Sequence, residues 1–324
     1  MSRLAQLQQD LQLASAAVAR AERVLAQYPN LPSALATLRT IENRRSSLEE
    51  QFFAAAAEAG LDVCGYRIEH SGSTASISGL TAVLGKFQKL FTTVYDALQH
   101  DGPKKKKARV SAEVADATSL QFAYTFPGSV GVMMTLPNEK LLFESKLDDA
   151  MKKTFELMTA QDAEHIQVLT DTVGLPAVRI AHEWAEENVT AGFGADIAWR
   201  RGDELKTEIR VQIPQITHLA SVLRLMKAKE QIEVVGQLLD VAITDRTFQM
   251  DVDDKIIHGT FDYTLINAMH PVQLPKTYLA TLTISQRVAL PESGAEQIEY
   301  HLLRLDEPPK DNDLMQANPD WGTM

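Results

Sequence analysis

The chain has 324 residues, of which 45% are hydrophobic, and its formal net charge is −11. This length suggests two or three domains, and the hydrophobic fraction is sufficient for a core that needs no disulfides or metal ions. The acidic balance opposes broad binding to nucleic acid, because such binding requires Lys and Arg side chains to neutralise phosphates. Cys64 is the only cysteine, which excludes an intrachain disulfide and a cysteine-based zinc site.

The same features predict a cytoplasmic protein. A single cysteine is typical of a reducing compartment. The sequence contains no apolar run near the ~18 residues that a membrane span requires. Its first residues lack the basic patch and apolar core of a secretory signal. We therefore expect no membrane association, and the alanine-rich composition suggests a bacterial source.

Residues 1–62 predict an antiparallel helical hairpin of the coiled-coil type. Apolar residues recur at three-four spacing in two consecutive runs, on either side of a turn that contains Pro29 and Pro32. This spacing holds one apolar seam on each helix against a partner helix, and proline interrupts the helix between the runs. The residues that we assign to this interaction surface are Leu4, Leu7, Leu11, Val18, Leu25, Leu38, Ile41, Arg45, Leu48 and Phe52.

Two interpretations of this hairpin stay open. It is either an ordinary packed pair of helices or an arm for oligomerisation or docking. Arg45 favours the arm, because a charge at a seam position selects register or partner at a cost in stability. Apolar residues outside the seam, such as Leu13, Val24 and Leu35, are expected to meet the body of the protein or another subunit.

Residues 63–230 predict a central domain of mixed α+β structure. Stretches with a period of two residues, which indicate strands, are interspersed with stretches of helical period. The expected elements are, in order, a strand at 64–68, a helix at 77–98, strands at 120–126 and 130–136, three helices within 144–192, a hairpin over 197–213 and a helix at 215–228.

From residue 231 to 305 the period is two throughout, which predicts a small antiparallel β-barrel of the SH3 or OB type. The fold class is therefore α+β. Residues 306–324 are acidic and contain prolines, so we expect a disordered tail. Leu314 and Trp321 stand among its acids and form a candidate peptide ligand for a groove. The expected barrel strands are 232–243, 246–252, 255–263, 277–288 and 297–305.

One arrangement of residues is compatible with catalysis. Asp196 begins a predicted strand, and Glu204 and Lys206 begin the next. An acid followed by acid-x-lysine on adjacent strands can hold Mg²⁺ while the lysine steadies a phosphate. The spacing is short for such a site, because Glu204 falls in the turn. A metal-dependent nuclease-like hydrolase is therefore the alternative that these three residues keep open.

Other motifs for metals or cofactors fail on spacing. Five residues separate Gly79 from Gly85, where a phosphate loop has four, and Phe87 replaces the hydroxyl that reaches the metal. His182 lacks the second histidine of a zinc-protease helix. We therefore expect no cofactor and no metal.

A local basic patch consists of four consecutive lysines in a chain that is otherwise acidic. It can mark an acidic partner, a contact with nucleic acid or a solvated loop between a helix and a strand. No aromatic residue lies within it, so base stacking has no support. The residues are Lys104, Lys105, Lys106 and Lys107.

These patterns predict a non-catalytic interaction protein, which is a scaffold or accessory subunit of a larger bacterial assembly. It is expected to associate with protein partners as a homo- or hetero-oligomer through its N-terminal coiled coil. Besides the hydrolase, a nucleic-acid or peptide-binding module using the C-terminal barrel remains an alternative, because small barrels bind such ligands across one face.

Overall fold

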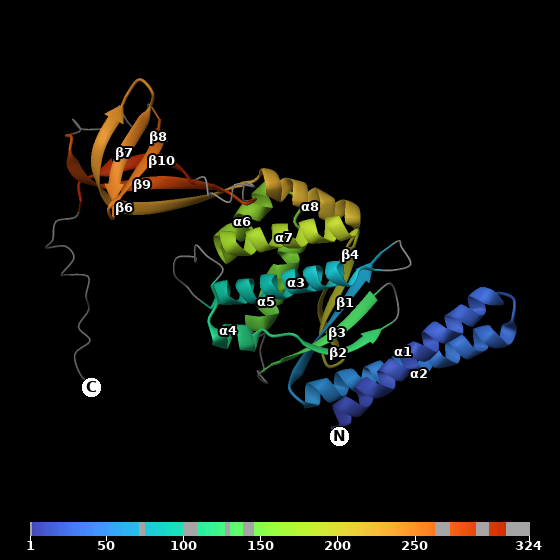
Figure 1. Cartoon of the computed structure of the whole chain (residues 1–324). Helices are drawn as coiled ribbons and strands as arrows, with labels where there is room; N and C mark the ends of the chain where they lie inside the picture. The colour runs from blue at the N-terminus through green and yellow to red at the C-terminus, as the bar shows by residue number, and fades with distance from the viewer. Residues whose placement is uncertain are drawn as a thin grey trace, which may run out of the picture. The chain divides into compact units, whose positions relative to one another are not determined.

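The structure, a computed structural model, describes residues 2–70, 75–99, 109–126, 130–138, 146–262, 273–289 and 298–308 (Figure 1). Within these ranges the chain has eight helices and two sheets, which confirms the α+β class. The chain divides into two compact units, Met1–Arg224 and Leu225–Met324. The finer division into four parts stays a prediction.

The first unit begins with two long helices, α1 (Arg3–Gln27) and α2 (Pro32–Glu58), which pack against each other (Figure 1). Ser2 caps α1, because its hydroxyl accepts a hydrogen bond from the amide of Ala5 at 3.2 Å. Pro32 occupies the first turn of α2, where its missing N–H costs nothing. The coiled-coil geometry of this pair stays a prediction.

A five-stranded antiparallel sheet follows, with strand order β2-β3-β1-β4-β5. The central strand β1 directly follows α2 in the chain. The tight turn at Gly202, where φ is +61°, joins β4 to β5. The strands are β1 (Leu61–Glu69), β2 (Gln121–Phe126), β3 (Val130–Pro137), β4 (Gly194–Arg201) and β5 (Glu204–Val211).

A layer of helices covers one face of this sheet (Figure 1). Tyr66 of β1 is fully buried there, and its hydroxyl accepts a hydrogen bond from the indole of Trp184 at 3.1 Å. Trp199 of β4 packs near Phe91, with ring centroids 6.1 Å apart. The helices are α3 (Ile77–Leu98), α4 (Ala112–Ala117), α5 (Lys146–Thr159), α6 (Ala163–Val173), α7 (Leu175–Ala191) and α8 (Ile213–Leu225).

A buried polar cluster joins the end of β4 to the start of β1 and to α5. The guanidinium of Arg201 donates to both carboxylate oxygens of Asp62, at 2.8 and 3.0 Å, and to Asp148 at 3.1 Å. Both carboxylates are almost completely buried. The indole of Trp199 also donates to Asp148, at 3.0 Å. Since an unpaired buried carboxylate is costly, Arg201 is required for this packing.

The second unit contains a closed barrel of five strands, in the order β10-β8-β7-β6-β9. This confirms the predicted five-stranded barrel, whereas its SH3 or OB type stays a prediction. Asp253 and Asp254 both have positive φ in the turn between β7 and β8, which is typical of a type I′ hairpin. The strands are β6 (Lys227–Ala242), β7 (Thr247–Val252), β8 (Lys255–Phe261), β9 (Lys276–Arg287) and β10 (Ile298–Asp306).

Two details of the barrel differ from the sequence prediction. The pairing of β8 with β10 is parallel, so the barrel is not antiparallel throughout. In addition, residues 226–228 were assigned to a helix, whereas β6 begins at Lys227, opposite Arg287 of β9. Helical periodicity cannot reveal a pairing between segments so distant in sequence. The barrel interior is filled by Leu238, Phe248, Met250, Phe261, Tyr278, Ala280, Leu282 and Leu302.

Candidate interaction site

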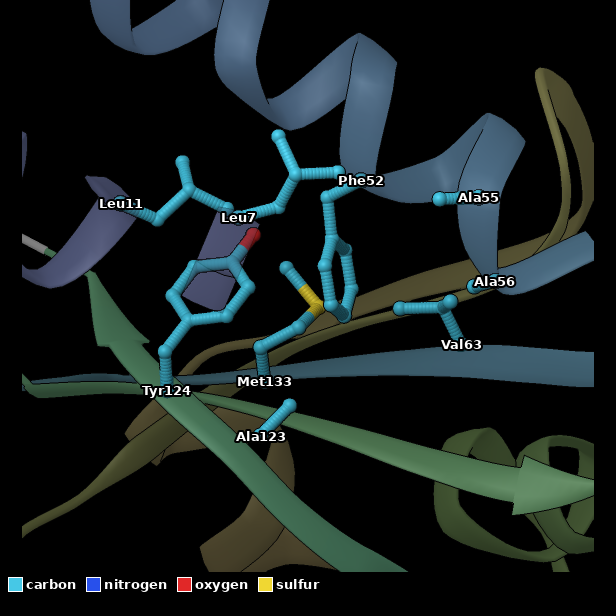
Figure 2. Close-up of a cluster of buried hydrophobic side chains, with 9 residues drawn as sticks. All are labelled: Leu7, Leu11, Phe52, Ala55, Ala56, Val63, Ala123, Tyr124 and Met133. Atoms are coloured by element: carbon cyan, nitrogen blue, oxygen red, sulfur yellow. The ribbon is translucent and has the colours of Figure 1, made fainter. Parts of the chain in front are cut away.

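The lower half of the helix pair, which we call the base, is anchored to the sheet. Figure 2 shows the cluster that anchors it, in which Phe52 of α2 lies over Tyr124 of β2. Their ring centroids are 5.1 Å apart and the rings are perpendicular, which is a favourable edge-to-face contact. The cluster consists of Leu7, Leu11, Phe52, Ala55, Ala56, Val63, Ala123, Tyr124 and Met133.

The other half, residues 13–44, extends beyond the sheet, and we call it the free half (Figure 1). No residue of the free half belongs to the cluster that anchors the base. Its buried side chains are Ala14, Val18, Ala34 and Leu38. Two of these four are alanines, so the free half buries less apolar side-chain volume than the base, where Leu7, Leu11 and Phe52 are buried.

A groove of about 420 Å³ lies on the free half. Its walls are mainly apolar, yet Val24 is 40% exposed and Leu31 is 45% exposed. Three of the residues that line the groove are alanines. The lining residues are Ala17, Arg20, Ala21, Val24, Leu31, Ser33, Ala34, Thr37 and Ile41.

Arg20 is the one charged residue among those that line the groove, and the free half as a whole carries more positive than negative charge, although the whole chain is acidic. The free half carries four arginines, all exposed, and only two glutamates. An apolar groove with an arginine in its wall is suited to an apolar segment that is flanked by acids. The charged residues are Arg20, Arg23, Arg39, Arg44, Glu22 and Glu42.

The structure divides the predicted seam between two roles. Leu4, Leu7, Leu11, Leu48 and Phe52 belong to the base or pack against its cluster. Val18 and Leu38 are buried in the free half, and Ile41 lines the groove. Leu25 is half-buried near the end of α1.

Arg45 is placed at the junction between the two halves. Its side chain is 23% exposed and lies 3.7 Å from the carboxylate of Glu49. It lines a cleft between α2 and the sheet, together with Arg67 of β1. The seam pattern identified Arg45 as unusual but did not reveal that it faces the sheet.

Asp196 does not lie close to the other two catalytic candidates, Glu204 and Lys206. Asp196 pairs with Arg210 in the β4–β5 ladder, whereas Glu204 pairs with Arg201 at the opposite end. Five strand positions separate Asp196 from Arg201, which corresponds to about 17 Å. Lys206 forms an ion pair with Glu204 at 2.7 Å. Asp196 instead lies 3.8 Å from Arg67.

The described ranges also bear on metal binding, on the reactivity of Cys64 and on membrane-spanning helices. They contain no group of three or more His, Cys, Asp or Glu side chains that could hold a metal ion. Cys64 is buried, and burial raises the pKa of its thiol well above the ordinary value, so the reactive thiolate is not accessible. No described helix combines the length and hydropathy needed to cross a bilayer.

Several predicted interaction residues lie outside the described ranges, so the structure does not address them. These are the four lysines at 104–107, together with Leu314 and Trp321 of the acidic tail.

Comparisons with known proteins add no identity. No family model, no curated protein and no solved structure matches this chain.

Proposed function

We propose that the protein is a non-catalytic interaction subunit, a scaffold or accessory component of a larger bacterial assembly in the cytoplasm. The α1/α2 pair is its docking arm. The observation that supports this proposal is the groove on the free half, where apolar side chains stay exposed although the base of the same helices is well buried. A contiguous apolar surface of this kind is a common mark of a protein–protein contact.

The partner that best fits the groove is an amphipathic helix with apolar residues at helical spacing and acidic residues beside them. Such a helix would place its apolar side chains between Val24 and Ile41 and its carboxylates near Arg20. Two identical free halves would repel each other, because each carries an excess of arginine. The arm therefore favours a hetero-oligomer over self-association.

Site-specific photo-crosslinking in the native cell tests this proposal. A benzoylphenylalanine residue in place of Ala21 lies in the groove, and the same residue in place of Val168 provides the control. Val168 is 60% exposed on α6, far from the groove in sequence. We expect a crosslinked partner from position 21 alone, whose crosslinked peptide is an acidic amphipathic helix. Equal crosslinking at both positions, or none at position 21, would contradict the proposal.

A further inference from the structure

A second concave site lies between α2 and the sheet, on the face that the base covers only in part. We call it the sheet cleft, and its volume is about 190 Å³. This is room for several water molecules or one small organic molecule. Its lining residues are Arg45, Glu49, Phe53, Gly65, Arg67, Phe126, Met133, Asp196 and Ala198.

The pairing of β1 with β4 explains why a hollow forms at this place. Gly65 lies opposite Ala198, so the two smallest side chains of this face meet in the middle of the ladder. Arg67 and Asp196 form the next pair on the same face, two residues further along each strand. The floor of the cleft is therefore open and one of its ends is charged.

The charged groups in the cleft do not form close hydrogen bonds with one another. Arg45 and Glu49 are 3.7 Å apart, and Arg67 and Asp196 are 3.8 Å apart, which exceeds the length of a good hydrogen bond. Within the described part of the chain, the buried Nε of Arg45 has no hydrogen-bond partner. Since a guanidinium carries five N–H donors, most of the donors of Arg45 and Arg67 remain for another acceptor.

Two phenylalanines form apolar walls of the cleft, and an arginine guanidinium lies near each ring. The guanidinium of Arg67 lies 5.4 Å from the centre of the Phe126 ring. Arg200 lies 5.6 Å from the centre of the Phe53 ring, which orients a third cation toward this region. Three arginines thus gather around one cleft that contains two acids.

The carboxyl group of Glu49 is held in a partly buried position among these arginines. Burial raises its pKa, although the charges of Arg45, Arg67 and Arg200 act in the opposite direction. Its carboxylate therefore takes up a proton more readily than an exposed glutamate.

We propose that the sheet cleft binds a small organic anion. Arg45 and Arg67 hold its oxyanion group, and Phe53 and Phe126 pack against its apolar part. Guanidinium groups suit this task, because their planar fork matches the geometry of carboxylate and phosphate oxygens. This site is distinct from the groove of the arm and does not depend on the docking function.

Calorimetric titration of the full chain tests the proposal with two probes, benzoate and inorganic phosphate. Benzoate represents an aromatic carboxylate, and phosphate represents a phosphoryl group without an apolar part. We expect saturable binding of benzoate. If phosphate binds as well, with the same dependence on the arginines, the oxyanion group dominates recognition and the walls contribute little.

The variants Arg45→Gln and Arg67→Gln should each weaken benzoate binding by roughly tenfold or more, since each removes charge-assisted hydrogen bonds. Arg44→Gln is the matched control, because Arg44 is exposed on the same helix and does not line the cleft. Circular dichroism verifies that each variant is folded. Absence of saturable binding of both probes, or equal affinity in all three variants, would overturn the proposal.

Discussion

The base and the free half of the α1/α2 pair belong to the same two helices but differ in what covers them. In the base, Phe52 and Leu11 are completely buried against the sheet. In the free half, Val24, Leu31 and Leu35 are all at least 40% exposed, and two of the four buried side chains are alanines. A coiled-coil pattern therefore identifies helices that associate, but it does not distinguish intramolecular packing from a surface kept open for another molecule.

The largest expected effect of a substitution is in the base. Phe52→Ala should lower the free energy of unfolding of residues 1–224 by about 3–5 kcal/mol, because it leaves a cavity beside Tyr124. Urea denaturation followed by tryptophan fluorescence measures this loss. A Trp321→Phe background restricts the signal to Trp184 and Trp199, since the chain has three tryptophans.

The control for this measurement is Ile77→Ala. Ile77 is 82% exposed, so its replacement should change the free energy of unfolding by about 0.5 kcal/mol or less. A loss below about 1 kcal/mol for Phe52→Ala would show that the base is not packed as tightly as the buried cluster indicates.

A smaller and more local effect is expected in the free half. Leu38→Ala should destabilise the free half by about 2 kcal/mol, near the lower end for a buried leucine, because its surroundings are small side chains that can partly close the gap. Hydrogen exchange should accelerate at the backbone amides of residues 13–44 and remain unchanged in β1. Equal acceleration in β1 would mean that the two halves unfold as one cooperative unit.

A third effect depends on pH and concerns the junction between the halves. Because burial raises the pKa of Glu49 above its ordinary value of 4.5, the native state holds this proton more strongly than the unfolded state. The contribution of Glu49 to stability is therefore present at low pH and is lost as the pH rises through the raised pKa.

The variant Glu49→Gln does not titrate, so its stability relative to the wild type should increase over the same pH range and become constant above it. The charges of Arg45, Arg67 and Arg200 lower the pKa of Glu49 and oppose the effect of burial, while Tyr124 and Asp196 are the other titratable groups that face it. Urea denaturation at several pH values measures the difference. A difference that is independent of pH would refute the raised pKa.

The smallest effect on stability is expected at the groove, together with the greatest effect on docking. Val24→Asp and Leu31→Asp replace side chains that are already exposed, so the free energy of unfolding should change by only about 0.5 kcal/mol. Both should abolish the crosslink from position 21. Leu13→Asp provides the control, because Leu13 is 63% exposed on α1 but does not line the groove. If all three variants crosslink equally, the groove is not the docking surface.

Periodicity was sufficient to predict the α+β class, because apolar residues repeat every two positions in the barrel and at helical spacing in α1 and α2. Pro29 and Pro32 marked the turn for a local reason. Periodicity could not predict the parallel pairing of β8 with β10, because this pairing depends on how segments distant in sequence meet in the fold. The helix α4 could not be predicted either, because it is too short to show a helical period.

The candidate sites were harder to predict from the sequence than the helices and strands. The seam identified Arg45, but the residues of the sheet cleft come from α2, β1, β2, β3 and β4, and no spacing in the sequence connects them. Conversely, Asp196 is close in sequence to Glu204 and Lys206, yet it lies toward the opposite end of their hairpin. Residues on the two different strands of an antiparallel hairpin come together only when they lie opposite or nearly opposite each other in the ladder.

The junction of the arm with the sheet has a mechanical consequence. Only Ala59 and Gly60 separate α2 from β1, and β1 is bonded on both sides, to β3 and to β4. Near this junction the guanidinium of Arg201 donates two hydrogen bonds to the carboxylate of Asp62. A force applied along α2 would therefore load an interior strand that is paired on both sides, before it reaches the edge strands β2 and β5.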